Sequence, residues 1–379
     1  MLDFTGWRQE IAALSKFTYV DTAQRGLTPA SVTAAGCAEL EAWQELAPHQ
    51  ATWELTSGVR TNVAEMLRVE ASEVALVGST GQGLNIVAGA FPWQPGDNVV
   101  VSTTEHPSNF YPWTNLKQRG VEVRLVPSAD GSLHPEDYEP FIDSHTRMVA
   151  ASLVSFYPGG LLAARQLADI AHQQGAYLVL DVIQAAGILP VYPRELGADA
   201  VAAAAYKGLM SAYGAGFLYI GQQLLPKLRP EHLYMAGVVG EYGVGGGKLT
   251  DPNYSWEQTA ALFEPGVHNL AGLGQMKRAL QIIGGIGVEA IGARVLTLAR
   301  KLAEGALALD YQVDTPLDSL AGIVCLRLAD GKGMVQYLDG RGIKASARRY
   351  GLRIAFHGYN NEQDVERVLS ALAEYPLRG

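Results

Sequence analysis

Two apolar runs that end in an acid and in a lysine decide the fold of this chain. The first run is Leu178-Val179-Leu180-Asp181-Val182-Ile183-Gln184, and the second is Ala200-Val201-Ala202-Ala203-Ala204-Ala205-Tyr206-Lys207-Gly208. Short apolar runs of this kind favour buried strands of a parallel sheet. Because open parallel sheets bind ligands beyond the carboxyl ends of their strands, Asp181 and Lys207 are candidate site residues.

Asp181 is a carboxylate at the end of an apolar strand, where it costs free energy unless it has a partner. A cationic ring nitrogen suits such a carboxylate, and pyridoxal phosphate (PLP) enzymes use this pairing to keep the pyridine protonated as an electron sink. The same residue could equally cap a helix or a turn. From this segment alone, both interpretations stay open.

Lys207 follows a run of small apolar residues, about two dozen residues after Asp181. A lysine in apolar surroundings has a lowered pKa and is a candidate Schiff-base amine. The alternative is a surface lysine that extends its charged end into solvent. The uniformly apolar residues before Lys207, and the glycines Gly208, Gly214 and Gly216 after it, favour the first interpretation.

A candidate phosphate site follows the predicted strand that ends at Val77. The segment Val77-Gly78-Ser79-Thr80-Gly81-Gln82-Gly83-Leu84-Asn85 passes through glycine and hydroxyl residues into an apolar helix predicted over Leu84 to Ala90. The free N–H groups of a helix N-terminus bind anions well. Many loops before helices share this composition, so the signal is weak by itself.

His106 lies in the segment Thr104-Glu105-His106-Pro107-Ser108-Asn109, just after another predicted strand. Its flat ring could stack on a cofactor ring or transfer protons near pH 7. A lone loop histidine more often has a structural role.

The wider pattern from Glu73 to Ile220 alternates short β-branched runs with amphipathic stretches, which is typical of a parallel α/β sheet. Beyond a glycine-rich loop at Gly237 to Asn253, the sequence predicts a helix at Leu270 to Gly284 and a smaller α+β unit. The predicted strands of the large sheet are Val74 to Val77, Asn98 to Ser102, Glu122 to Val126, Met148 to Val154, Tyr177 to Asp181, Ala200 to Ala203 and Gly216 to Tyr219. The remaining predicted elements are a helix at Leu161 to Gln174, strands at Gly322 to Leu328 and Leu352 to Ala355, and a helix at Glu362 to Leu372.

Composition narrows the class of protein. The 379 residues are 48% hydrophobic and 18% charged, so the chain can bury a large core. A net charge of −9 argues against nucleic acid or an anionic membrane as the main partner. The only cysteines, Cys37 and Cys325, have no metal-ligand spacing and predict neither a disulfide framework nor a metal site. We expect no signal peptide and no membrane span, and a cytoplasmic location.

Taken together and in this order, these segments resemble the class V aminotransferase family, which includes cysteine desulfurases, selenocysteine lyases, isopenicillin N epimerase and kynureninase. The resemblance runs from Tyr19-Val20-Asp21-Thr22-Ala23, similar to the family's Tyr-Leu-Asp-x-Ala, to Leu352-Arg353-Ile354-Ala355-Phe356-His357-Gly358-Tyr359-Asn360-Asn361, similar to its Arg-x-Ser-x-x-x-Tyr-Asn-Thr. It implies the fold of type I PLP-dependent transferases: a large, mostly parallel seven-stranded sheet domain and a small α+β C-terminal domain. The implied limits are 1–15 for an N-terminal segment packed on the small domain, 16–255 for the PLP-binding domain and 256–379 for the small domain.

Carried over by position, the resemblance implies that PLP forms an internal aldimine with Lys207, that Asp181 pairs with the pyridine nitrogen, and that His106 stacks over the ring. These three would be the catalytic residues. The other implied contacts are Gln184 near the phenolic oxygen, Thr80, Gly81 and Gln82 at the phosphate, and Arg353 at the substrate carboxylate. The resemblance further implies a homodimer, with each site completed by the other subunit's loop around Gly266 to Asn269.

Several positions depart from the family's pattern. Ala204 and Tyr206 replace the Ser-x-His that precedes the lysine in relatives, Val267 replaces a phosphate-binding Thr, and Phe156 replaces an Asn near the phenolic oxygen. A lost hydrogen bond to a charged group costs roughly 1.5–3 kcal/mol, so we expect PLP to bind loosely. The side chains that could compensate are Tyr206, His268 and Asn269 at the cofactor, and Tyr157 or Gln184 near the phenolic oxygen. We also expect Tyr157, with Arg353, to bind the substrate.

The reaction is less determined than the site. The loop at Lys344 to Gly351, where a desulfurase carries its mobile cysteine, has none, and Cys325 lies in an apolar strand-like run. We therefore expect chemistry on a small amino acid through an external aldimine and an α-carbanion, namely β-elimination of the C–S lyase kind or transamination, with no enzyme persulfide. The alternatives are α-epimerisation and a noncatalytic binding or regulatory protein. The arginines at 348 and 349, with Tyr350, could bind a polar or acidic substrate side chain or form a solvated surface.

Overall fold

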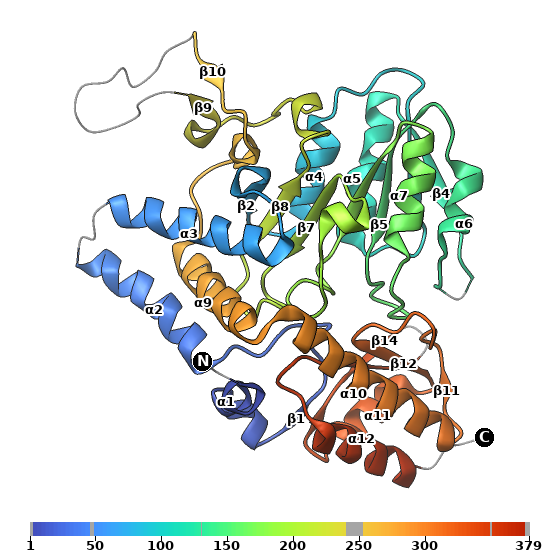
Figure 1. Ribbon diagram of the computed structural model, residues 1–379. Helices are drawn as coiled ribbons and strands as arrows, with labels where there is room; N and C mark the ends of the chain where they lie inside the picture. The colour runs from blue at the N-terminus through green and yellow to red at the C-terminus, as the bar shows by residue number, and fades with distance from the viewer. Residues whose placement is uncertain (1–2, 46–48, 130, 240–252, 349–350, 376–379) are drawn as a thin grey trace.

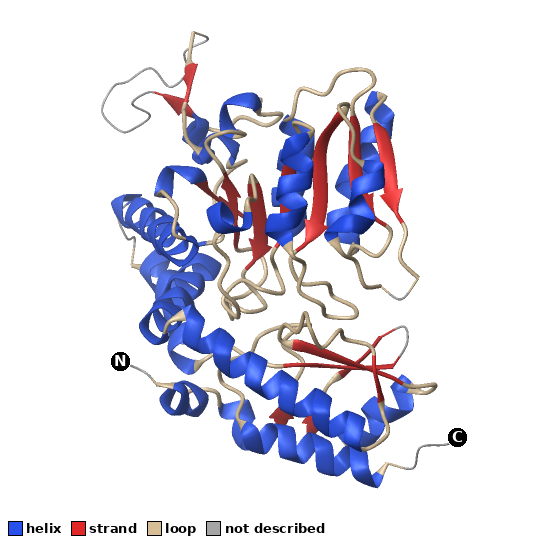
Figure 2. Cartoon of the chain, turned by 45° about the vertical axis from the view of Figure 1, so that its right-hand side comes forward, coloured by secondary structure: helices blue, strands red, loops and turns tan. Residues whose placement is uncertain are grey.

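The protein has two lobes of unequal size, seen in a computed structural model that describes residues 3–45, 49–129, 131–239, 253–348 and 351–375. A large sheet flanked by helices forms one lobe, and a small sheet covered by helices forms the other (Figure 1). Most strands of the large sheet point their carboxyl ends toward the small lobe (Figure 2). The ends of those strands therefore face the junction between the lobes.

The large sheet has seven strands in the order β2-β8-β7-β6-β5-β3-β4. Only β8 runs antiparallel to its two neighbours, so the sheet is mostly parallel, as predicted. The strands are β2 (Val74–Val77), β3 (Asn98–Ser102), β4 (Glu122–Val126), β5 (Thr146–Ser152), β6 (Tyr177–Asp181), β7 (Ala200–Ala204) and β8 (Gly216–Ile220).

Both faces of this sheet are buried except at its edge strand β4, which explains why the inner strands are largely apolar and not alternating. On one face Val99, Val179 and Ala202 pack with α4 (Thr80–Ala90) and α5 (Pro107–Thr114). On the other face lies α7 (Ala164–Gln173), which buries Leu167, Ala168 and Ala171 at helical spacing.

Several predicted elements begin or end elsewhere in the structure, two of them helices whose starts differ by three or four residues. α4 begins at Thr80 and not at Leu84, because the Ser79 hydroxyl caps it by accepting from the Gln82 N–H over 3.1 Å. The predicted helix at Leu161 to Gln174 begins only at Ala164. Leu161 instead forms a β-bridge with Val154.

The small lobe is built on an antiparallel sheet in the order β11-β12-β15-β14. Part of the segment 344–351, which we expected to be a loop, forms strands instead, and residues 349–350 lie outside the described residues. The elements of this lobe are α10 (Val288–Ala308), β11 (Gln312–Val313), β12 (Ile323–Arg327), α11 (Gly331–Asp339), β13 (Ile343–Lys344), β14 (Ser346–Arg348), β15 (Gly351–Ala355) and α12 (Glu362–Glu374).

The N-terminal segment contacts the small lobe. Trp7 is fully buried and packs its ring edgewise on His357 and Tyr359. Arg8 forms an ion pair with the buried Asp364 over 2.8 Å. The limits proposed for the three parts of the chain stay a prediction.

The remaining elements connect or flank the two sheets. The predicted glycine-rich loop begins with a short turn and strand, and its residues 240–252 lie outside the described residues. α9 packs chiefly on α2 and α3, on the side of the large lobe. These elements are α1 (Phe4–Gln9), β1 (Thr18–Tyr19), α2 (Ala30–Gln44), α3 (His49–Leu67), α6 (Pro135–Tyr138), α8 (Pro193–Leu196), β9 (Val238–Val239), β10 (Ser255–Trp256) and α9 (Leu270–Ile286).

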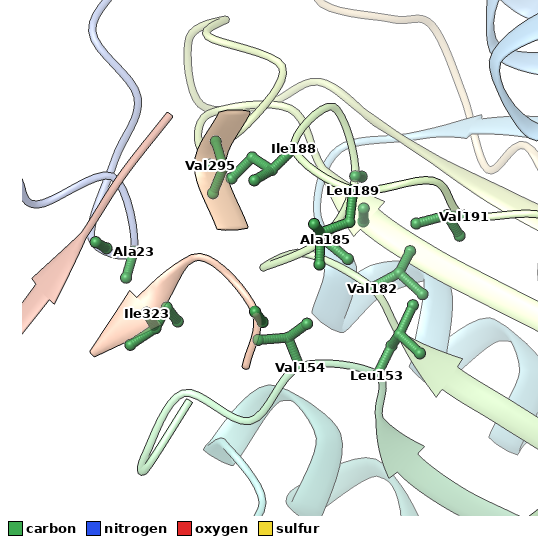
Figure 3. Packing of buried hydrophobic residues seen from close by; sticks show 14 of the residues in the cluster. Ala23, Leu153, Val154, Val182, Ala185, Ile188, Leu189, Val191, Val295 and Ile323 are labelled. Carbon is green, nitrogen blue, oxygen red and sulfur yellow. The ribbon is translucent and has the colours of Figure 1, made fainter. Parts of the chain in front are cut away.

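A shared apolar cluster joins the two lobes (Figure 3). It contains Val154 and Ile188 from the loops after β5 and β6, and Val295 and Ile323 from the small lobe. Since a buried aliphatic side chain contributes about 1.5–3 kcal/mol, this seam holds the lobes in a fixed relation. The site residues that each lobe contributes are thereby fixed as well.

No single helix in the described part of the chain is long and apolar enough to cross a membrane; only the bent pair α9 and α10, which meet at 80°, passes that test together by length and composition.

Candidate active site

Asp181 and Lys207 lie at the carboxyl ends of the neighbouring strands β6 and β7. Both side chains are almost fully buried, with 3% and 7% exposed. Burial is the largest influence on Asp181 and raises the pKa of its carboxyl to about 6, although the nearby Lys207 charge opposes this shift. Burial is also the largest influence on Lys207 and lowers the pKa of its amine to about 8, although the Asp181 charge opposes that shift. The lysine amine is therefore easier to deprotonate than a surface lysine, while the acid stays available as an anion near neutral pH.

The backbone around Lys207 is fixed from three directions. The Gly26 N–H donates to the Tyr206 carbonyl over 2.9 Å, and the Met210 N–H donates to the carbonyl of Lys207 over 3.0 Å. His357 from the small lobe lies 2.8 Å from the Gly208 carbonyl. A Cβ on Gly208 would lie 2.1 Å from the Ala186 carbonyl oxygen, so only glycine fits after the lysine.

The N-terminus of α4 meets the same strand end. The Thr80 hydroxyl accepts from the Ala204 N–H over 2.9 Å, which ties α4 to β7 three residues before Lys207. The Gln82 side chain accepts from the Gly78 N–H over 2.6 Å. The first N–H groups of a helix have no partner within the helix, so α4 directs Thr80 and Gly81 toward an anion.

His106 caps α5, where its Nδ1 accepts from the Ser108 N–H over 3.2 Å. Its ring meets Phe156 edge to face, with 5.6 Å between centroids. Burial, followed by the charge of Lys207, lowers the pKa of His106. These influences favour the neutral ring, and the ring lies within electrostatic reach of the lysine.

Arg353 is a buried guanidinium with unused hydrogen-bonding capacity. It is 2% exposed, its Nη1 donates to the Phe156 carbonyl over 3.3 Å, and its Nη2 lies 3.6 Å from Asp21. Its Nε and Nη2 form no hydrogen bond within the described residues. Buried donors left unpaired are costly. A planar guanidinium with two free donors matches a carboxylate.

Strand pairing places further polar residues beside Arg353. Ser346 on β14 lies opposite Arg353 on β15, and its hydroxyl donates to Asp21 over 2.7 Å. Arg348, two residues further on, faces the same way as Ser346 because side chains alternate along a strand. Cys325 on β12 is also opposite Arg353. One face of the small sheet therefore presents all these groups.

Three of the predicted contact residues are already engaged elsewhere. The Tyr157 hydroxyl bonds to Asp314 of the small lobe, and the roles expected of Tyr157 near the phenolic oxygen and at the substrate stay predictions. Gln184 is buried and donates to the Ala23 carbonyl over 3.2 Å, which leaves its oxygen available. His268 pairs with Glu264 over 2.9 Å.

Asn269 and Val267 lie in the loop assigned to the dimer contact. Asn269 caps α9 by accepting from the Gly272 N–H over 3.1 Å, and it donates to the Tyr213 carbonyl over 3.1 Å. Val267 is 85% exposed. Within one chain, then, both polar atoms of the Asn269 side chain already form a hydrogen bond, and its predicted role across a dimer stays a prediction.

Tyr206, which replaces the family's His, packs on Tyr213 with 4.6 Å between ring centroids. Ala204, which replaces its Ser, is buried at the end of β7. Ala204 supplies no polar side chain to the site, and the cofactor contact expected of Tyr206 stays a prediction.

Two acids at the site were not predicted from the sequence. The Glu105 carboxylate accepts from Ser152 N–H and hydroxyl groups over 2.7 and 2.5 Å and from Asn109 over 3.0 Å, and burial raises its pKa to about 7. Asp21 accepts from Ser346 and faces Arg353. In the sequence, only the positions of Glu105 and Asp21 inside the motifs around His106 and Tyr19 could have indicated that they belong to the site.

The described residues contain no group of three or more His, Cys, Asp or Glu side chains that could hold a metal ion.

The sequence pattern of the family described as Aminotransferase class-V matches residues 18–368. The chain belongs to this class V aminotransferase family. Its members are PLP-dependent enzymes, and so is this chain.

Relatives in this family carry desulfurase names. A probable cysteine desulfurase of Methanothermobacter thermautotrophicus is 29% identical over 84% of this chain and 76% of its own. A probable cysteine desulfurase of Pyrococcus abyssi is 28% identical over 83% of this chain and 80% of its own.

Solved structures share the fold. The apo cysteine desulfurase of Thermococcus onnurineus NA1 superposes with a TM-score of 0.85 at 25% identity, over 97% of this chain and 96% of its own. The cystine C–S lyase C-DES, solved with its product cysteine persulfide, has a TM-score of 0.86 at 21% identity, over 96% and 99% of the two chains. The predicted type I fold is confirmed.

The residues of this class V enzyme fit PLP. Asp181 is a buried carboxylate whose pKa is raised by burial, so a ring cation beside it would relieve the cost of its charge. Lys207 has no carboxylate within 4.0 Å among the described residues, which leaves its amine for the cofactor aldehyde. The α4 N-terminus and the unpaired donors of Arg353 supply two separate anion sites, one for a phosphate and one for a carboxylate.

Proposed function

We propose that this chain is a PLP-dependent β-lyase that breaks the bond between the β-carbon and a sulfur leaving group of a small amino acid, without an enzyme persulfide. The observation that carries this proposal is the state of Cys325. It is 1% exposed, and burial raises the pKa of its thiol to about 12. A buried neutral thiol is not a nucleophile.

Cys325 is close to the site, so burial and not distance makes it inert. It lies opposite Arg353 in the pairing of β12 with β15. Cys37, the other cysteine, is exposed on α2, which packs on α9 away from the lobe junction (Figure 1). Relatives named as desulfurases support chemistry at a carbon–sulfur bond, and the missing thiol acceptor favours simple elimination.

PLP would be held covalently by Lys207, at its ring by Asp181 and His106, and at its phosphate by the α4 N-terminus. When bound, it supplies an electron sink for the pair left at the substrate α-carbon. Arg353 binds the substrate carboxylate and thereby fixes the orientation of the α-carbon. The Lys207 amine, with its pKa near 8, removes the α-proton as general base.

The bonds balance without an external oxidant or reductant. The α-proton passes to the Lys207 nitrogen, the bond from the β-carbon to sulfur breaks, and its electron pair leaves on sulfur. Addition of water to the remaining fragment gives pyruvate and ammonia, and the sulfur leaves as a thiol or persulfide. Transamination would instead convert PLP to pyridoxamine phosphate and release the 2-oxo acid of the intact substrate.

The test is a product assay with purified enzyme, PLP and L-cystine, L-cysteine or S-methyl-L-cysteine. Pyruvate and ammonia in equal amounts support elimination. Pyridoxamine phosphate without ammonia would show transamination, racemised substrate would show epimerisation, and a colourless protein unchanged by PLP would show a noncatalytic one.

Two cysteine variants test the absence of a persulfide. Cys325→Ala and Cys37→Ala should each keep sulfur release within about two-fold of wild type, since neither thiol takes part. A loss greater than ten-fold in a folded Cys325→Ala enzyme would overturn this part of the proposal. Circular dichroism of both variants provides the folding control.

A further inference from the structure

The face of the small sheet that carries Arg353 also carries a second arginine that the proposed chemistry does not use. Ser346 lies opposite Arg353, and Arg348 lies opposite Gly351. Residues paired across two strands, and residues two apart on one strand, share a face. Arg348, Ser346 and Arg353 therefore project on the same side, toward Asp21.

That side is the site side of the sheet. Arg353 donates to the Phe156 carbonyl, and the Phe156 ring packs on His106. The charge of Arg348 also acts on residues of the large lobe. After burial and the Lys207 charge, it is the next cause that lowers the pKa of His106. Arg348 is thus a neighbour of the site from across the lobe junction.

Arg348 has no acid partner in the described part of the chain. Among the described residues, its guanidinium donates from Nη1 to the carbonyl of its own neighbour, Ala347, over 2.7 Å. The Asp21 carboxylate, toward which this face is turned, already accepts from Ser346 and lies 3.6 Å from Arg353. A half-buried guanidinium with free donors is a ready partner for an anion.

The residue opposite Arg348 has no side chain that could pair with its guanidinium. Gly351 has no side chain, and a Cβ there would lie 2.0 Å from the Leu326 carbonyl oxygen. The Leu326 backbone excludes any side chain at position 351, so no residue there competes for the Arg348 guanidinium. A substrate that places its α-carboxylate on Arg353 lies on the same face of the sheet as Arg348, and its side chain can extend toward that guanidinium.

We propose that Arg348 binds an anionic group at the end of the substrate side chain, so that the enzyme selects amino acids carrying a second carboxylate or a comparable anion. The inference rests on the proposed function only in assigning the α-carboxylate to Arg353. The two arginines then have separate roles. Arg353 binds the α-carboxylate that all amino acids share, and Arg348 binds the side-chain anion that distinguishes the preferred substrates.

The test measures equilibrium binding to the PLP-loaded enzyme and needs no turnover. Probes are the dicarboxylates succinate and glutarate and the matched monocarboxylates butyrate and valerate, with binding followed by calorimetry and by the cofactor absorbance. The wild-type enzyme should bind a dicarboxylate at least about ten-fold more tightly than its matched monocarboxylate, as one charge-assisted hydrogen bond provides.

Variants then assign the preference to one side chain. Arg348→Gln should weaken dicarboxylate binding about 10- to 100-fold and leave monocarboxylate binding within two-fold. Arg353→Gln should weaken both classes. Arg341→Gln removes an exposed arginine that pairs with Glu374 in the same lobe, and it should change neither.

Two results would overturn the inference. Equal binding of both classes by the wild type would refute it without any variant, even if Arg348→Gln failed to fold. An equal loss of both classes in folded Arg348→Gln would show that Arg348 acts on the α-carboxylate. A failure of the elimination assay with dicarboxylate selectivity intact would refute the reaction and not this site.

Discussion

His357 in the small lobe lies with its Nε2 2.8 Å from the carbonyl oxygen of Gly208, the residue after Lys207. The Gly358 N–H donates to Nδ1 over 2.7 Å, so the proton of the neutral ring lies on Nε2, which donates to Gly208. The ring is fully buried and stacks on Tyr359 with 4.8 Å between centroids. A histidine of one lobe therefore positions the backbone beside the cofactor lysine of the other.

Replacing His357 should loosen this backbone. We expect His357→Leu to lower the free energy of unfolding by about 1–3 kcal/mol, because the Gly208 carbonyl loses its donor. His357→Gln, which can still donate, should recover part of the loss. Denaturant unfolding measures both, and His145→Leu on the exposed surface should cost under about 0.5 kcal/mol. Equal values for the Leu variants at 357 and 145 would contradict the positioning role.

The same residue predicts an acid-labile fold. Burial lowers the pKa of His357 from 6.5 to about 4. Because the folded state holds the neutral ring, the unfolded state binds the extra proton, and stability is lost as pH falls from about 6.5 to about 4. The loss contributed by His357 is up to about 3 kcal/mol. Comparing unfolding of wild type and His357→Gln at pH 7 and pH 4.5 isolates it, and a difference independent of pH would rule it out.

The large sheet could be predicted closely because each strand is a short apolar run between glycine or polar breaks. The predicted and observed limits of Tyr177–Asp181 coincide. β5 is displaced by two residues, since Val154 leaves the sheet to bridge with Leu161. The start of α4 was predicted four residues too late, at Leu84, although Ser79 and Gln82 stand at capping-box spacing before the observed start at Thr80. The apolar pattern of each strand could be predicted from the local sequence, whereas bridges between distant residues could not.

The candidate site could be predicted in its members but not in its contacts. Asp181, Lys207 and Arg353 are all buried at the lobe junction. Tyr157, by contrast, bonds to Asp314, 157 residues away, and no local pattern reports such a pairing. The role of Asp21 likewise depends on the register that sets Ser346 opposite Arg353. Contacts of this kind require the tertiary structure.

The lowered pKa of Lys207 should govern how the enzyme takes up its cofactor. Only the deprotonated amine attacks an aldehyde, so the rate of covalent PLP attachment to apoenzyme should rise with pH and reach half its maximum near pH 8. An ordinary lysine would give a midpoint near 10.5. Stopped-flow absorbance near ~420 nm follows the attachment. Borohydride trapping should locate it on Lys207, and Lys207→Ala should abolish it; a midpoint above pH 10 would disprove the shift.

Asp181 should destabilise the protein when PLP is absent. Burial raises its pKa from 3.8 to about 6, so the folded state binds the proton more tightly, and the charge costs stability as pH rises through that range. We expect Asp181→Asn apoprotein to be about 1–3 kcal/mol more stable than wild type above pH 6 and equally stable at pH 3.5. The holoenzyme of the same variant should lose activity at least 100-fold. A variant that is less stable at both pH values would contradict this account.

Ala204 and Tyr206 replace the family's Ser and His beside the lysine, so the affinity for PLP should be low and can be tested. Ala204 ends β7 beside Thr80, whose hydroxyl already accepts the Ala204 N–H. A serine there would add a donor at the phosphate end of the site, and Ala204→Ser should lower the PLP dissociation constant about ten-fold. Ala203→Ser, on the opposite face of the strand, should leave it unchanged. Equilibrium dialysis against PLP measures all three proteins. If the wild type kept stoichiometric PLP through exhaustive dialysis, the prediction of weak PLP binding would be wrong. Tyr206 or the partner subunit's loop would then have to supply the missing contacts.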